Sequence, residues 1–386
     1  MFKRVALFLV LSLAAAAVAV SASSTADSAS KGTAASRMAV GFYDDESVYG
    51  RTDWAFTQLK ALRAGVVRIT INWSAIARRR PAVASDPADP AYNWGAVDNV
   101  VTQASKNRIR VVAAIIATPR WAGRARNRLP RRINDLRMFA FAAAKRYSGT
   151  FEVEPATATE PARVLPAIRH WLAWNEPNNP VFLRPQWKMV KRVWRPQSAF
   201  DYAKICNAIW GGVHSTGLAG QKVACGVTGP RGNDAPRSSR RSTSPLVFMQ
   251  WLRRAGLKRF DAYAHHPYYG HRSEKPSTAP KSKKAVTLGN IGVLIKQINR
   301  LWGRKRLWIT EYGYQTRPPD RQFGVPYRLQ AKYVHQAIAR ARKTRRVDMF
   351  IWFLIRDERR ISGWQSGVVT VNGKRKPAFR AFQRRR

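Results

Sequence analysis

The sequence predicts an α/β protein folded as a single closed (β/α)8 barrel. Three observations lead to this prediction. From residue 38 onward, short apolar runs alternate with amphipathic stretches. There are eight such runs, over a length that suits one barrel domain. A doubly wound open sheet is the alternative, but it would normally show a glycine-rich phosphate turn after its first strand, and none is present here.

The eight apolar runs are largely hydrophobic on both faces, which is typical of buried parallel strands. We expect strands at 38–43, 66–72, 110–117, 169–174, 222–227, 260–265, 306–310 and 347–354.

Helices are predicted between these strands from apolar residues at helical spacing and from stop signals such as Gly65. The expected helices are 53–64, 94–105, 133–147, 200–216, 245–255, 289–302, 328–343 and a short last helix at 376–383. Long loops are expected at 149–167, 228–244 and 269–286, and loops of this length commonly surround a binding cleft.

The N-terminus has the pattern of an export leader. Lys3 and Arg4 precede an apolar run at 5–20, and small-residue cleavage patterns follow. We expect a secretory signal peptide at 1–22, a disordered linker at 23–37 and the barrel at 38–386. An uncleaved N-terminal anchor is the alternative. No other segment is long and apolar enough to span a bilayer.

Composition limits the function classes. The chain of 386 residues is 45% hydrophobic, so it can bury a large core and is not disordered overall. Its 69 Lys and Arg against 22 Asp and Glu give a net charge of +47. The basic clusters are spread over loops, and no nucleic-acid reading motif is present, so we expect no specific nucleic-acid partner. Attraction to anionic wall polymers is one interpretation of the charge, and general adaptation to the medium is the other.

The two cysteines, Cys206 and Cys225, leave two possibilities open. Export would permit a disulfide between them, and two buried free thiols are the alternative. Neither has metal-ligand spacing, and we expect no metal and no cofactor.

Two predicted strands end in a glutamate. The fourth ends in Trp174-Asn175-Glu176-Pro177 and the seventh in Thr310-Glu311-Tyr312-Gly313. Because a (β/α)8 barrel carries its active site at the carboxyl ends of its strands, both carboxylates should reach the same cleft. A pair of carboxylates is what cleavage of a glycosidic bond needs: one protonates the leaving oxygen and the other attacks or assists at the sugar carbon.

These two motifs, over nearly all of 38–382, resemble the clan of retaining β-glycosidases on (β/α)8 barrels, which includes families 5, 10 and 39 (cellulases and β-xylosidases among them). The resemblance implies that Glu176 is the acid/base and Glu311 the nucleophile. Thr118-Pro119-Arg120-Trp121, where family 5 members often carry a histidine, is more similar to family 39.

The resemblance also implies substrate-binding or supporting roles for further residues. Arg68 would favour an ionised Glu311, Tyr268 would donate to Glu311, and Asn175 would bind a sugar 2-hydroxyl. The whole predicted binding set is Arg68, Asn175, His266, Tyr268, Trp352 as an aromatic platform, and Trp121. His265 should point away from the cleft, because successive strand residues face opposite sides.

We therefore expect a secreted, monomeric glycosidase acting on an oligo- or polysaccharide. A catalytically weak sugar-binding barrel and a polyanion-binding surface protein are the alternatives. The first would not need both carboxylates, and binding by the second would collapse with salt.

Export is directly testable. N-terminal sequencing of the protein recovered outside the cell should begin between Val20 and Ser23, because the cleavage patterns lie there. Recovery of the full-length chain from the cytosol alone would contradict the leader.

Overall fold

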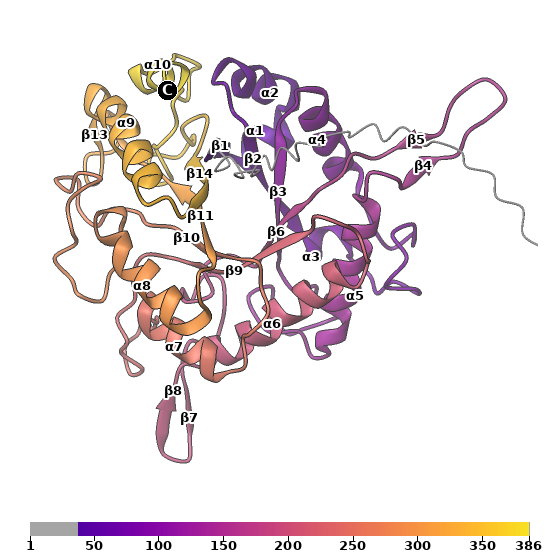
Figure 1. Ribbon diagram of the computed structural model, residues 1–386, viewed down its shortest axis with the longest axis horizontal. Helices are drawn as coiled ribbons and strands as arrows, with labels where there is room; N and C mark the ends of the chain where they lie inside the picture. The colour runs from indigo at the N-terminus through magenta and orange to yellow at the C-terminus, as the bar shows by residue number, and fades with distance from the viewer. Residues whose placement is uncertain (1–37, 386) are drawn as a thin grey trace, which may run out of the picture. The chain divides into compact units, whose positions relative to one another are not determined.

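The structure, a computed structural model, describes residues 38–385. Eight parallel strands close into a barrel in the order β1-β14-β11-β10-β9-β6-β3-β2, and Figure 1 shows the helices around them. The barrel strands are β1 (Ala39–Tyr43), β2 (Val66–Asn72), β3 (Arg110–Ile116), β6 (His170–Ala173), β9 (Lys222–Thr228), β10 (Ala262–His265), β11 (Arg306–Tyr312) and β14 (Val347–Phe353). The predicted fold is confirmed, and each predicted strand coincides with one of these. The leader and linker predicted at 1–37 lie outside the described residues.

Strand alternation divides the core into two. Small and medium side chains such as Val112, Ala114 and Ala264 fill the barrel interior, together with Trp308 and Met349. The opposite faces of the same strands pack against the helices and form a second, larger apolar cluster. The strands are therefore buried on both sides, which is why they are apolar runs in the sequence.

The helices follow the predicted pattern. The outer helices are α2 (Thr52–Ala61), α4 (Gly95–Lys106), α5 (Ile133–Arg146), α6 (Gln197–His214), α7 (Pro245–Arg254), α8 (Ile291–Trp302), α9 (Tyr327–Lys343) and α10 (Pro377–Gln383). Short helices α1 (Asp45–Gly50) and α3 (Trp73–Ile76) were not predicted, and the 3-10 turn η1 (Leu288–Asn290) forms the start of the helix predicted at 289–302. No helix of the described residues is long and apolar enough to cross a membrane.

Segments expected to be plain loops carry small two-stranded sheets. An antiparallel hairpin, β4 (Glu152–Glu154) with β5 (Arg163–Val164), lies in the predicted loop at 149–167. A second hairpin, β7 (Lys188–Val190) with β8 (Val193–Arg195), occupies a basic segment. Both project from the barrel in Figure 1. A third pair, β12 (Thr316–Arg317) with β13 (Val325–Pro326), follows β11.

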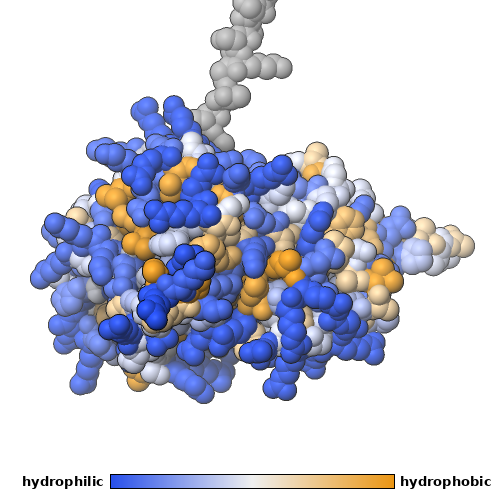
Figure 2. All heavy atoms as spheres, turned by 90° about the horizontal axis from the view of Figure 1, so that it is seen from below, coloured by the Kyte–Doolittle hydropathy of each residue, from blue (hydrophilic) through white to orange (hydrophobic). Residues whose placement is uncertain are grey.

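The surface is mostly hydrophilic. Hydrophilic residues cover most of the face seen in Figure 2, and hydrophobic ones occur there in small groups. This is the expected surface of a chain with so many lysines and arginines.

The backbone leaves β geometry where the strands end. Ala117, Trp174, Val227 and Leu354 follow or end β3, β6, β9 and β14 and have φ between 43° and 76°. A non-glycine residue in this region costs about 1–3 kcal/mol and is most common at functional sites. Part of the backbone strain therefore lies at the barrel's carboxyl end.

A disulfide joins Cys206 on α6 to Cys225 on β9, with the Cα atoms 6.0 Å apart. The structure thus decides between the two possibilities that the sequence left open. The bond joins an outer helix to β9, which pairs with β6, and Glu176 lies directly after β6.

Loss of this disulfide should destabilise the barrel. The cross-linked residues are 19 apart, so Cys206→Ala combined with Cys225→Ala should lower the free energy of unfolding by about 3 kcal/mol. Urea denaturation followed by circular dichroism measures this. Dithiothreitol should destabilise the wild type and leave the double variant unchanged. Two thiols titratable in the denatured, unreduced wild type would contradict the bond.

Candidate active site

Glu176 and Glu311 meet at the carboxyl end of the barrel. Glu176 lies on the turn after β6, and Glu311 lies in β11. One oxygen of each carboxylate and one nitrogen of His266 lie within 4.8 Å of one another. The two side chains are 13% and 9% exposed, so both reach the cleft surface.

A bulge in β11 directs Glu311 into the cleft. Ile309 pairs with Phe350 and Tyr312 with Trp352, so β11 has one residue more than β14 in this stretch. Trp308 faces the barrel interior, whereas Tyr312 packs in the outer cluster, which a strict alternation would not allow. The extra residue turns Glu311 toward the mouth of the barrel, a common use of a bulge beside a site.

Arg68 on β2 is the centre of the hydrogen-bond network. The guanidinium is fully buried. Its Nη1 donates to Glu311 Oε1 at 2.7 Å and to the Thr310 carbonyl at 3.0 Å. Its Nη2 donates to Asn175 Oδ1 at 2.8 Å, and its plane lies 4.2 Å from the centre of the Tyr43 ring. Burial is the largest single influence and opposes its charge, but Glu311, together with the acidic groups of Tyr43, Asp45 and Tyr268, outweighs burial and raises the pKa of Arg68.

His266 is held as one tautomer of the neutral ring. Burial lowers its pKa to about 3. Nε2 lies 3.2 Å from Arg68 Nη1, which presents only N–H groups, and 3.0 Å from the Thr310 hydroxyl, which can donate, so Nε2 is the acceptor. The proton is then on Nδ1, which donates to Glu176 Oε1 at 2.9 Å. His266 thus connects the Arg68–Glu311 pair to Glu176.

Tyr268 completes the surroundings of Glu311. Its hydroxyl donates to Glu311 Oε2 at 3.1 Å. Both oxygens of Glu311 therefore accept a hydrogen bond, from Arg68 and from Tyr268, as suits an ionised carboxylate. Burial raises the pKa of Tyr268 well above its usual value, so the hydroxyl keeps the proton that it donates.

Glu176 has a different environment. Burial is the largest influence on it and raises its pKa. Asn179 Nδ2 donates to Glu176 Oε2 at 3.0 Å and acts in the opposite direction, as does the charge of Arg231. Glu176 thus holds a proton to higher pH than an ordinary carboxyl, and it can still accept both of its hydrogen bonds when protonated.

Close packing fixes the position of Glu176. A Cβ atom on Gly229, just after β9, would lie 2.9 Å from the carboxyl group of Glu176. Asn178 joins the two loops: its Oδ1 accepts from Gly229 N at 2.8 Å, and its Nδ2 donates to the Thr243 carbonyl at 3.0 Å. These residues were not identified from the sequence. The repeated asparagines after Glu176-Pro177 were the available signal, since such side chains commonly hold turns.

The predicted platform residue Trp352 is not in the cleft, and this prediction was wrong. Trp352 is fully buried, its Nε1 donates to the Ser366 carbonyl at 2.8 Å, and its ring packs edge-on against Phe382 of α10. Alternation along β14 places Met349 and Ile351 inside the barrel and Trp352 outside. The next residue, Phe353, faces the site instead.

An aromatic wall therefore forms from other residues. The ring of Trp364 lies 5.0 Å from that of Tyr268 and 5.3 Å from that of Phe353. Trp364 is 36% exposed, so its ring can be reached by a ligand. Indole rings stack well on the apolar face of a sugar.

The remaining predicted residues fall at the same end of the barrel. Asn175 is buried next to Arg68, and its amide nitrogen makes no hydrogen bond within 38–385, which leaves it able to donate. Trp121 lies after β3, with its ring edge on Trp73 and Arg80 over its face. His265 points away, as predicted, and bonds Thr228 and the Val286 carbonyl.

Glu176, His266 and Glu311 also form a possible metal-ligand set. The hydrogen bonds do not suit a cation there. Nδ1 of His266 carries a proton, and Glu311 is already paired with the positively charged Arg68. The donor set fits proton transfer better than coordination.

Comparisons with known proteins agree on the fold. A family 39 glycoside hydrolase from Bacteroides cellulosilyticus is similar over 89% of this chain and 62% of its own, with a TM-score of 0.60 and 15% identity. A glucosidase from Croceicoccus marinus is similar over 90% and 67%, with a TM-score of 0.61 and 15% identity. A β-glucosidase from Thermotoga maritima is similar over 87% and 86%, with a TM-score of 0.56 and 10% identity.

At such low identity the likeness shows the (β/α)8 fold that glycoside hydrolases of this kind share. The chain spans about three fifths of the length of the family 39 structure. No family model and no curated protein matches the sequence.

The influence of Asn179 on Glu176 can be measured. Asn179→Ala removes a donor that favours the charged carboxylate, so the pKa of Glu176 should rise further above the usual carboxyl value. A pH titration followed by the ¹³C chemical shift of the labelled carboxyl measures it. Asn99→Ala, an exposed asparagine on α4, is the control and should leave the titration unchanged. A lowered pKa in Asn179→Ala would contradict the assignment.

Proposed function

We propose that this protein is a retaining β-glycosidase that cleaves O-glycosidic bonds of a glycan. The observation that carries the proposal is the pair Glu176 and Glu311, with carboxylate oxygens within 4.8 Å of each other and opposite environments. In retaining enzymes the two carboxyl groups are about 5–5.5 Å apart, whereas inverting enzymes need a wider gap for a water molecule. The structural neighbours named above are glycosidases, which supports the same reaction class.

Glu311 is the nucleophile in this proposal. Arg68 and Tyr268 hold its two oxygens, so the carboxylate is oriented before substrate arrives. Its oxygen attacks the anomeric carbon, the bond from that carbon to the leaving oxygen breaks, and a covalent glycosyl-enzyme forms.

Glu176 is the acid and then the base. Its raised pKa suits a group that must be protonated at the start. It gives its proton to the leaving oxygen in the first step. In the second step it takes a proton from water, whose oxygen attacks the anomeric carbon and releases Glu311.

Two further groups would position the sugar. The free amide of Asn175 is placed to donate to a sugar hydroxyl beside Glu311, and Trp364 offers its face to a pyranose ring. We also propose that the protein acts outside the cell, which rests on the leader pattern of residues 1–22.

Chemical rescue distinguishes the two carboxylates. Glu311→Ala should abolish turnover of every glycoside, because no covalent intermediate can form. Glu176→Ala should lower kcat/KM by roughly 10²–10⁴-fold on poor leaving groups. On an activated aryl glycoside it should show a burst, since the second step lacks its base.

Added azide identifies each role. In Glu176→Ala azide should restore turnover and give the β-glycosyl azide, whereas in Glu311→Ala only the α-azide can form. Product configuration by ¹H NMR is the measurement. Glu160→Ala, an exposed carboxylate outside the cleft, is the control and should keep full activity. If Glu176→Ala gave the α-azide and Glu311→Ala the β-azide, the two roles would be reversed. Full activity of both variants would contradict the proposal that the protein is a glycosidase.

A further inference from the structure

A large pocket lies beside the site, on the side of Glu176. Its volume is about 870 Å³, and it is formed by the loops that follow β3, β6 and β9. Asn179, which bonds Glu176, is part of its wall. The pocket therefore borders the catalytic cleft.

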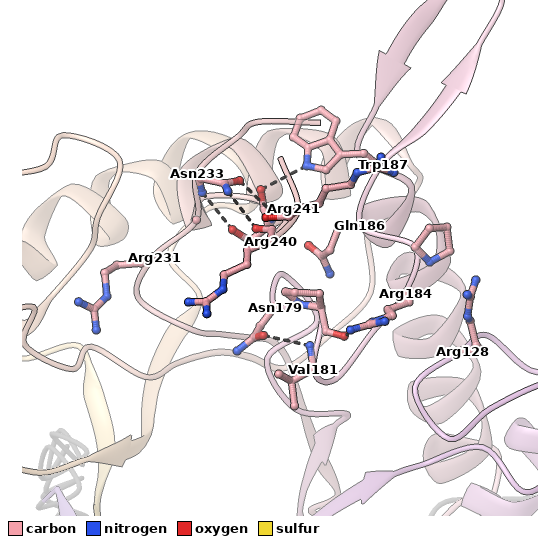
Figure 3. A pocket seen from close by; sticks show the side chains of 15 residues that line it. Arg128, Asn179, Val181, Arg184, Gln186, Trp187, Arg231, Asn233, Arg240 and Arg241 are labelled. Carbon is pink, nitrogen blue, oxygen red and sulfur yellow. Dashed lines mark hydrogen bonds between the residues drawn. The ribbon is translucent and has the colours of Figure 1, made fainter. Parts of the chain in front are cut away.

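The wall of this pocket is strongly cationic. Figure 3 shows side chains of Arg128, Arg184, Arg231 and Arg240 arranged around the hollow, and Arg241 is a fifth lining arginine. All five are exposed, and no Asp or Glu lines the pocket. Within residues 38–385 none of the five forms an ion pair with a carboxylate.

The carboxylates close to these arginines are already engaged. Asp234 Oδ1 accepts from the backbone of Ser244 at 2.7 Å, and its Oδ2 lies 3.9 Å from Lys284. Asp201 accepts from Gln197 at 2.7 Å. Glu274, which lies near Arg231, accepts from Gly270 N at 2.7 Å. Because none of these carboxylates is paired with a pocket arginine, the pocket keeps a positive charge that attracts an anion from solution.

Several of the guanidinium groups are held in place by backbone atoms. Arg184 Nε donates to the Pro180 carbonyl at 2.8 Å, and Arg231 donates to the Gly270 carbonyl at 3.3 Å. Each retains further N–H groups that can donate to a ligand. A guanidinium fork matches a carboxylate or a sulfate with two parallel hydrogen bonds.

The other side of the site has no such cluster of arginines. A smaller hollow next to Tyr43 and Phe353 is lined by five acidic residues, of which Asp357 is paired with Lys376, and by one arginine. Because Tyr43 packs under Arg68, this hollow lies on the side of Glu311. An anionic sugar is therefore favoured at one end of the cleft only.

We propose that the arginine-lined pocket is a subsite for an acidic sugar, bearing a carboxylate or a sulfate ester, on the leaving-group side of the cleaved bond. The proposal rests on the proposed function, because the acid/base residue protonates the leaving oxygen and the pocket adjoins that residue. The substrate would then be a β-linked glycan that carries carboxylate or sulfate groups. A nucleic acid would use the same charge, but its phosphates would bind basic residues over the whole surface, not this pocket alone.

The test compares two double variants that each remove two positive charges. Arg184→Gln with Arg240→Gln alters the pocket. Lys296→Gln with Arg300→Gln alters the exposed face of α8 and is the matched control. Initial rates are measured on carboxymethylcellulose and hydroxyethylcellulose, and on chondroitin with and without sulfate. Calorimetry with the same glycans in the Glu311→Ala background measures binding without turnover.

The pocket variant should lose roughly tenfold in affinity and kcat/KM for the acidic glycans relative to the neutral one, and the control should not. A loss on both chondroitins identifies the carboxylate as the recognised group, and a loss on the sulfated form alone identifies the sulfate ester.

Equal effects of the two double variants would overturn the proposal, because they would assign the attraction to total charge. Binding of duplex DNA is measured for the same variants. If the pocket variant lost affinity for DNA and kept its preference for acidic over neutral glycans, the proposal would be overturned as well. Absence of hydrolysis of every glycan by the wild type would reject the proposed function, while calorimetry would still decide whether the pocket binds acidic sugars.

Discussion

The rest of the site depends on the buried ion pair between Arg68 and Glu311. Burying a guanidinium without a partner is costly, and removing one member of a buried pair typically destabilises a protein by about 3–5 kcal/mol. The two terminal nitrogens of Arg68 find their partners where β2, β6, β10 and β11 come together, through Glu311, Asn175, His266 and the Thr310 carbonyl, and only Nε is left without one among the described residues. Closure of the barrel and assembly of the site are therefore one event: strands in any other register would leave this charge unpaired.

The same pair makes the two carboxylates unequal. Arg68 forms its ion pair with Glu311, while the direct hydrogen-bond partners of Glu176 are the neutral ring of His266 and the amide of Asn179. Burial then dominates at Glu176 and raises its pKa. Two identical side chains, less than a sugar's width apart, thus have different surroundings: Arg68 and Tyr268 hold the oxygens of Glu311, and burial dominates at Glu176. Trp174 and Glu176 have strained backbone, with φ of 70° and 33°, which persists because the surrounding contacts hold it.

Most of the fold could be predicted because the pattern that encodes it is local. A strand buried on both faces must be an apolar run, and eight such runs separated by amphipathic helices leave few arrangements other than the barrel. The two glutamates could be predicted because each directly ends a run. Trp352 could not be placed correctly, because the bulge in β11 and the alternation in β14 decide which of two adjacent aromatic residues faces the cleft. Asn178, Gly229 and the arginine-lined pocket lie on loops that approach one another only after folding, and no periodic pattern records that approach.

The net charge of +47 is not distributed evenly around the cleft. A charge spread evenly over the surface would attract any polyanion and orient none. Here five arginines gather in the pocket next to Glu176, whereas the hollow next to Tyr43 is lined mainly by acidic residues. An electric field with this direction can orient an anionic glycan before the glycan reaches the two catalytic carboxylates. Binding energy gained in the pocket, away from the bond that breaks, can then contribute to holding the reacting sugar against Glu311, which is how remote contacts come to accelerate a chemical step.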